Sequence, residues 1–179
     1  MPNPSKTGRQ ELDVGKLIEG MAGLLDSMVG KKATLRRKLA VALPRIVADS
    51  GQVRQVVVHL TANAADALGD SSGDIEISTG VMWAEGGELP SLLAGRVLCA
   101  GLYVYIEVRD TGCGMDVETQ TRIFDHFFSD ELTGREPGLA VVAGIVRGHR
   151  GSIQVTSRLG EGTIFRVLFP AKEVSRGET

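Results

Sequence analysis

The sequence predicts a two-layer α/β domain in which a mixed, mostly antiparallel sheet is covered on one face by about three helices. Some segments repeat apolar residues at helical spacing, whereas others alternate apolar and polar residues with a period of two. These segments follow one another in the order α, β, α, β, β, α, α, β, β. That order favours strands that pair with sequence neighbours and helices that share one face, rather than a doubly wound sheet.

The clearest helical pattern is an apolar stripe preceded by Asp49 and Ser50, either of which suits an N-cap. An earlier helical pattern begins after Asp13, another good N-cap, and ends at Gly30. The expected helices are residues 14–28, 52–68 and 139–147, with a shorter one at 117–128.

Period-two alternation predicts the strands, and Pro44 closes the first of them. A long connection from Gly80 to Gly101 separates two of them. We expect Trp83 to anchor it, and a role for Trp83 in docking a partner stays open as the alternative. The expected strands are residues 34–41, 75–78, 104–108, 152–157 and 163–169.

Composition and charge limit the possible functions. We expect a disordered leader or linker at residues 1–11, one domain at 12–170 and a tail at 171–179. A net charge of −2 argues against nucleic acid as a partner, and the absence of a long apolar run argues against membrane contact by this segment. Only two cysteines occur, which fits a reducing, cytoplasmic location.

The helix expected at 52–68 carries three polar residues at i, i+4 and i+7, namely His59, Asn63 and Asp66. This spacing stacks the three side chains on one flank of the helix. The carbonyl oxygen of an asparagine suits Mg2+, which takes most of its other ligands from water and phosphate. An ordinary solvent-exposed face would explain the same pattern.

Three further motifs have both a functional and a structural interpretation. Asp110 follows a strand and can accept a hydrogen bond from an exocyclic amino group, while Gly112 and Gly114 leave room for a flat ring. The glycine-rich start of the 139–147 helix suits an anion such as phosphate. The hairpin containing Thr163 can direct a hydroxyl towards a ligand. Each motif alone is equally compatible with an ordinary turn.

Together these motifs resemble the ATP-binding catalytic domain of sensor histidine kinases, within the superfamily that includes the gyrase B subunit and MutL. The resemblance covers residues 12–170 and implies the two-layer sandwich known as the Bergerat fold. The matching segments are residues 55–67 (the N box), 110–114 (G1), 123–128 (F), 134–140 (G2) and 160–165 (the last glycine box).

The resemblance implies that Asn63 binds Mg2+ and that Asp110 reads the adenine amino group. It places His59, with Asn63 a candidate catalytic residue, near the γ-phosphate, where it either orients the transfer or, as we expect, only hydrogen-bonds. A mobile lid between Phe128 and Gly138 would close over the phosphates of ATP. The implied nucleotide-binding residues are Asn63, Asp66, Asp110, Gly112, Gly114, Met115, Phe127, Gly134, Arg135, Gly138, Leu139 and Thr163. The implied partners are a histidine phosphoacceptor (dimerisation) domain and, downstream, a response regulator receiver.

Two departures from the family pattern affect these expectations. None of the three histidines has the sequence context of a phosphoacceptor, so the acceptor is expected on a domain outside this chain. Where relatives usually have Thr-Lys before the G2 box, this chain has Asp130 and Glu131, and Glu136 and Pro137 replace the usual Gly-Leu within it. Added carboxylates repel a triphosphate, so we expect weak nucleotide binding, with ATP affected more than ADP.

Two alternative functions remain open at this point. A degenerate, non-catalytic regulatory module would explain the acidic lid. An anti-sigma serine kinase of the same superfamily would suit a chain of this size, although the segments at 123–128 and 139–149 resemble sensor kinases more closely.

Overall fold

A five-stranded sheet forms the centre of the computed structural model, which describes residues 8–88, 97–126 and 138–172. The first strand in space pairs in parallel with its neighbour, and the other three pairings are antiparallel. The mixed, mostly antiparallel sheet predicted from the sequence is therefore confirmed. Its spatial order is β2 (Ala33–Lys38), β4 (Gly73–Ala84), β7 (Gly101–Asp110), β9 (Gly162–Pro170) and β8 (Ser152–Arg158).

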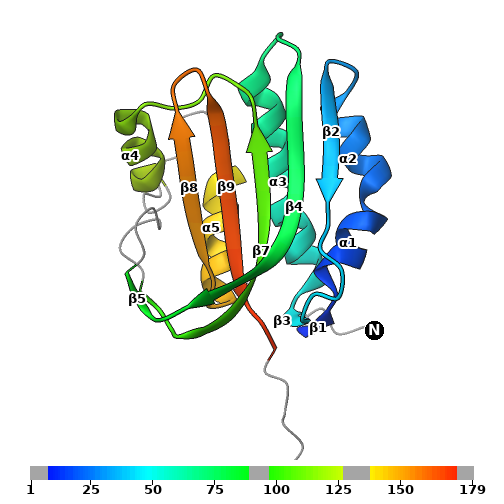
Figure 1. The fold of residues 1–179 in the computed structure, drawn as a ribbon, viewed down its shortest axis with the longest axis vertical. Coiled ribbons are helices and arrows are strands. Elements are labelled where there is room, and N and C mark those ends of the chain that lie inside the picture. Colours follow the sequence, from blue (N-terminus) through cyan, green and yellow to red (C-terminus); the bar gives the residue numbers. More distant parts are fainter. Residues whose placement is uncertain (1–7, 89–96, 127–137, 173–179) are drawn as a thin grey trace, which may run out of the picture.

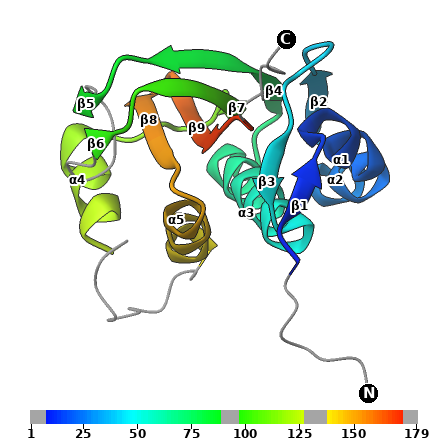
Figure 2. The same ribbon diagram turned by 90° about the horizontal axis from the view of Figure 1, so that it is seen from below.

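Helices cover one face of this sheet and leave the other open (Figures 1 and 2). Another helix, α4, lies beside the β8 edge (Figure 1). Short strands β1 (Gln10–Leu12) and β3 (Ile46–Ala48) pair at the end of the domain that is lowest in Figure 1. Strand β5 (Gly87–Glu88) pairs with β6 (Val97–Leu98). The helices are α1 (Val14–Gly20), α2 (Ala22–Val29), α3 (Ser50–Leu68), α4 (Val117–His126) and α5 (Gly138–Gly148).

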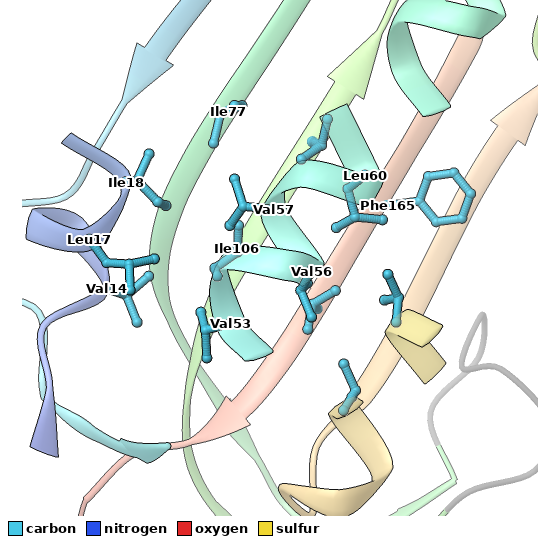
Figure 3. Packing of buried hydrophobic residues seen from close by; sticks show 14 of the residues in the cluster. Val14, Leu17, Ile18, Val53, Val56, Val57, Leu60, Ile77, Ile106 and Phe165 are labelled. Atoms are coloured by element: carbon cyan, nitrogen blue, oxygen red, sulfur yellow. The ribbon is translucent and has the colours of Figure 1, made fainter. Parts of the chain in front are cut away.

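The core lies between the helices and the covered face, and α3 is its central helix (Figure 3). Val53, Val56, Val57 and Leu60 from one stripe of α3 are at most 1% exposed. Each such side chain contributes about 1.5–3 kcal/mol when fully buried. Asp49, rather than Ser50, caps this helix, because its carboxylate accepts a hydrogen bond from the Gln52 amide at 3.0 Å.

Some predicted boundaries were wrong. The helix expected at 14–28 is two helices, because the chain turns at Met21, where the apolar spacing continues without interruption. Gln10 and Glu11 belong to β1 rather than to a leader, and Ala171 bridges to Ile46 rather than starting a free tail. Residues 1–7 and 173–179 lie outside the described residues.

The predicted connection beginning at Gly80 is instead a continuation of β4, which pairs with β7 as far as Ala84. A side chain at position 80 would overlap the Tyr105 ring, since a Cβ there would lie 2.4 Å from the Tyr105 hydroxyl oxygen. This two-stranded extension, residues 80–84 and 101–105, bends across the open face (Figure 1). One of its faces buries Ala84, Leu98 and Tyr103 against Leu168.

A buried histidine links the ends of two core helices. The Nε2 atom of His149 accepts a hydrogen bond from the Asp49 amide at 3.2 Å, and Nδ1 lies 2.8 Å from the Ile145 carbonyl oxygen. The ring also packs edge-on against Phe169. The carboxyl end of α5 is thereby fixed to the amino end of α3. No helix in the described part of the chain is both long and apolar enough to cross a bilayer.

Candidate functional site

Helix α3 presents the polar residues expected on one of its flanks. His59 and Asn63 are half-buried, whereas Asp66 is exposed. Asn63 lies one turn before Ala67, whose carbonyl oxygen accepts a hydrogen bond from the Cys113 amide at 3.2 Å. The loop after Asp110 is therefore attached to α3 about one helical turn from Asn63.

Asp110 ends strand β7 at a position in phase with the inward-facing Val104, Ile106 and Val108. Its side chain is buried, with 3% exposure, and one carboxylate oxygen accepts a hydrogen bond from the Gly112 amide at 2.9 Å. Burial raises the pKa of Asp110, and backbone hydrogen bonds from Gly112 and Thr163 partly oppose that rise. A carboxylate has about four acceptor positions, so capacity remains for a ligand donor.

Glycines allow the loop after Asp110 to approach both α3 and the β8–β9 hairpin. A Cβ on Gly112 would lie 2.5 Å from the Ala67 carbonyl oxygen. Gly114 has φ +68°, and a Cβ there would lie 1.9 Å from the Arg158 carbonyl oxygen. The Gly160 amide donates to the Cys113 carbonyl oxygen at 2.7 Å, which joins loop and hairpin.

A polar network at the hairpin was not predicted. The Ser157 hydroxyl lies 2.8 Å from the Thr163 hydroxyl, accepts a hydrogen bond from the Met115 amide at 2.8 Å and donates to the Gly162 carbonyl oxygen at 3.1 Å. Gln120 donates to the carbonyl oxygens of Met115 and Ser157 at 3.0 and 3.1 Å. The sequence contained a signal for Ser157, because it is a polar residue in phase with the inward-facing Ile153 and Val155.

The loop after Asp110 joins the segments that carry the three groups expected to form a nucleotide site. The loop that follows Asp110 contacts the α3 turn next to Asn63 and the hairpin that carries Thr163, which pairs with Asp110 in the sheet. Met115 is half-buried in this loop, and Gly138 and Leu139 begin α5, which packs against α3. Phe127, Gly134 and Arg135 lie outside the described residues.

Two hairpin glycines offer a matched test of this packing. Gly162 has φ +95°, and a Cβ there would lie 2.0 Å from the Asp110 carbonyl oxygen, whereas Gly160 has φ +80° and open space around it. We expect Gly160→Ala to lower the free energy of unfolding by about 1–2 kcal/mol, the cost of a left-handed backbone. Gly162→Ala should cost about 2–5 kcal/mol, because overpacking adds to that cost. Urea unfolding measures both, and equal losses would contradict the close packing.

Comparison with known proteins identifies the family and the fold. The family model described as "Histidine kinase-, DNA gyrase B-, and HSP90-like ATPase" matches residues 48–173, more than half of the chain. The chain belongs to this ATPase family. The matched region contains α3, the Asp110 loop, α5 and the β8–β9 hairpin.

Relatives within this ATPase family are sensor kinases. Sensor kinase CckA of Brucella abortus (strain 2308) is 33% identical over 165 residues, which are 89% of this chain and 17% of that protein. The histidine-protein kinase AtoS of Escherichia coli (strain K12) is 28% identical over 168 residues, 93% of this chain and 25% of AtoS. The chain thus spans a quarter or less of these two relatives.

Solved structures support the fold of this ATPase-family domain. Full-length ShkA in complex with AMPPNP has a TM-score of 0.67 and 22% identity, covering 93% of this chain and 32% of ShkA. The catalytic domain of histidine kinase ThkA, in a nucleotide-free form, has a TM-score of 0.62 and 21% identity, covering 91% of this chain and 95% of that domain. The predicted family and fold are confirmed.

Proposed function

We propose that this domain transfers the γ-phosphate of Mg-ATP to a histidine on a phosphoacceptor domain outside this chain, from which a response regulator receives it. The observation that carries the proposal is the buried Asp110 carboxylate, held where the α3 turn and the β8–β9 hairpin meet. The sensor-kinase relatives support the same reaction, and we propose that it takes place in the cytoplasm.

Recognition of adenine is assigned to Asp110. A buried carboxylate gains most from a donor such as the adenine amino group, because water does not compete for it there. Gly112, Gly114 and Met115 would line the base pocket, and Thr163 would add a hydroxyl at its edge. The network around Ser157 fixes these atoms before the nucleotide arrives, which lowers the ordering cost of binding.

Asn63 is assigned as the protein ligand of Mg2+, with Asp66 next to it on the exposed flank. Across the described residues, no group of three or more acidic, histidine or cysteine side chains is arranged to hold a metal by itself. A single amide oxygen fits an ion that keeps waters and takes its other ligands from ATP phosphates. Bound there, Mg2+ would neutralise phosphate charge during transfer. His59, one turn earlier, would hydrogen-bond near the γ-phosphate without moving a proton.

The phosphates of ATP are assigned to the amino end of α5, where Gly138 and Leu139 begin the helix. Its first amides and its dipole suit an anion. Gly134, Arg135 and Phe127, outside the described residues, are assigned to the same side of the nucleotide from the sequence alone.

The acidic residues before the G2 box are proposed to weaken ATP binding. Replacing Glu131 by lysine exchanges repulsion of the ATP phosphates for attraction. For partly screened charges this change is worth on the order of 1–3 kcal/mol of binding free energy. We expect Glu131→Lys to raise the affinity for ATP by about tenfold and for ADP by less. Calorimetric titration of the original chain measures the baseline. Low-micromolar binding of Mg-ATP, tighter than that of ADP, would contradict the proposal.

The phosphotransfer itself is tested with radiolabelled ATP and a separately supplied histidine-phosphoacceptor domain from a sensor kinase. The expected product is acid-labile, alkali-stable phosphohistidine on the acceptor. Acid-stable phosphoserine on an anti-sigma-type substrate would instead indicate a serine kinase. ATP binding without transfer to any acceptor would indicate a regulatory module.

A further inference from the structure

The extension of β4 and β7 is apolar on both of its faces, although only one face is covered. Ala84, Leu98 and Tyr103 are buried against the sheet. On the opposite face, Trp83 is 64% exposed and its cross-strand partner Leu102 is 37% exposed. Val81, two residues earlier on the same face, is 47% exposed. A strand with apolar residues on both faces is typical of one that is packed on both sides.

A groove of about 580 Å³ runs along this uncovered face. The apolar residues that line it include Trp83, Leu102, Pro44, Pro170 and Ala171. Trp83, which was expected to anchor this segment, has most of its side chain exposed to solvent, which favours the docking role that the sequence left open. An exposed tryptophan in a concave apolar surface is the feature most often found at the energetic centre of a protein interface.

The rim of the groove is positively charged. Among the described residues that line it, the charged ones are Arg150 and Lys172. Glu11 forms ion pairs with both Lys172 and Arg45. The cations Arg45, Arg150 and Lys172 therefore outnumber this carboxylate, although the whole chain has a net charge of −2. Such a rim favours a partner with carboxylates beside its apolar residues.

The backbone around the groove argues against strand addition. Pro44 and Pro170 have no amide hydrogen. The Ala171 amide already donates to the Leu102 carbonyl oxygen at 2.9 Å, and the Lys172 amide donates to the Arg45 carbonyl oxygen at 2.7 Å. A ligand in this groove would therefore be recognised through its side chains rather than by main-chain pairing. An amphipathic helix that lies in an apolar groove is recognised in this way.

We propose that this groove, defined by Trp83, Leu102, Pro44, Pro170, Arg150 and Lys172, binds an amphipathic helix of a partner protein whose apolar face is flanked by carboxylates. Ala171, which lines the groove, bridges to Ile46 in β3, whereas Asp110 pairs with Thr163 at the opposite end of β7 and β9, where the β8–β9 turn lies at the top of Figure 1. The proposal does not depend on the function proposed above.

The chain contains its own reporter, because Trp83 is its single tryptophan. The probe is a synthetic helical peptide with leucines along one face and glutamates on either side, compared with the same peptide carrying lysines in place of the glutamates. We expect the acidic peptide to shift Trp83 fluorescence to shorter wavelength and to bind at least tenfold more tightly than the basic peptide. Equal binding of both peptides, or no binding, would overturn the proposal.

Variants locate the binding surface by calorimetry. Trp83→Ser should weaken binding of the acidic peptide by about thirtyfold, as for a truncated interface hot spot. Arg150→Gln should weaken it several-fold at low salt and less at high salt. Leu24→Ser, on the exposed side of α2, and Arg54→Gln, on α3, are the matched controls and should not affect it. Unchanged ATP affinity in Trp83→Ser shows that the domain remains folded.

Two other occupants are distinguished in the same experiment. If vesicles of phosphatidylcholine with phosphatidylglycerol shift Trp83 fluorescence and the acidic peptide does not, the groove binds a membrane surface instead and the proposal is wrong. Sedimentation showing a dimer that Trp83→Ser dissociates would replace it with self-association.

Discussion

Asp110→Asn is expected to lower ATP affinity by about tenfold to a hundredfold while leaving the free energy of unfolding at neutral pH unchanged or higher. The loss corresponds to one hydrogen bond to a charged acceptor, about 1.5–3 kcal/mol. Asparagine offers one oxygen to the Gly112 and Thr163 amides and adds an amino group where the adenine would donate. Stability does not fall in parallel, because the substitution removes a negative charge whose burial is unfavourable, the same burial that raises the pKa of Asp110. Calorimetry and urea unfolding measure the two effects.

The pH dependence of binding tests the same carboxylate. Because the pKa of Asp110 is raised from 3.8, the group takes up a proton at a higher pH than an exposed aspartate. Because the pKa is raised in the folded state, the charged carboxylate destabilises the folded protein at pH values above that pKa. This destabilisation disappears as the pH falls through the pKa. Adenosine affinity should therefore decrease as pH falls, starting above the ordinary aspartate range, while the contribution of this group to stability improves.

Adenosine is used because it has no phosphate to titrate. Asp116→Asn is the control, since Asp116 is exposed and its pKa is lowered by hydrogen bonds from Thr119. It should leave adenosine binding unchanged. If Asp110→Asn binds adenosine as well as the original chain does, the assignment of the base site is wrong.

Asn63→Ala is expected to reduce phosphotransfer by about a hundredfold or more. Loss of the proposed protein ligand of Mg2+ removes several kcal/mol of charge stabilisation during transfer, and each 1.36 kcal/mol is a factor of ten in rate. Adenosine affinity should be unchanged, because the base site is assigned to Asp110. The measurement is the single-turnover rate of acceptor labelling as a function of Mg2+ concentration. We expect half-maximal labelling to require a higher Mg2+ concentration in the variant.

His59→Ala is the matched comparison for Asn63→Ala, since it lies one turn away on the same flank of α3 and is equally half-buried. We expect it to cost clearly less than Asn63→Ala, as loss of a hydrogen bond near the γ-phosphate would. If His59→Ala lowered the phosphotransfer rate more than Asn63→Ala, and Asn63→Ala left the Mg2+ dependence unchanged, the roles assigned to the two residues would have to be exchanged.

Long periodic elements were predictable from the sequence, and short or interrupted ones were not. Helix α3 was evident because its apolar stripe is continuous and capped. The turn at Met21 was missed because Leu17, Met21 and Leu25 keep helical spacing across it. The three-residue strands β1 and β3 are too short to show a period, and β3 pairs with residues far away in the sequence.

The extension of β4 was missed for a different reason. Gly80 suggested a turn, whereas its small size serves to admit the Tyr105 ring of the neighbouring strand, which no local pattern reveals. In the candidate site, Asp110, Gly112, Gly114 and Thr163 were found through their motifs. The hydrogen bonds of Ser157 depend on how three segments meet, and sequence spacing alone does not fix that meeting.

The histidine at the end of α5 determines how that helix can respond to ATP. His149 is buried and joined to Asp49, so the carboxyl end of α5 is fixed to the amino end of α3, the same helix that carries Asn63. Towards its amino end, α5 buries Val142 in the core that it shares with α3. A phosphate bound at Gly138 would therefore act on a helix that is held along its length to the helix carrying Asn63.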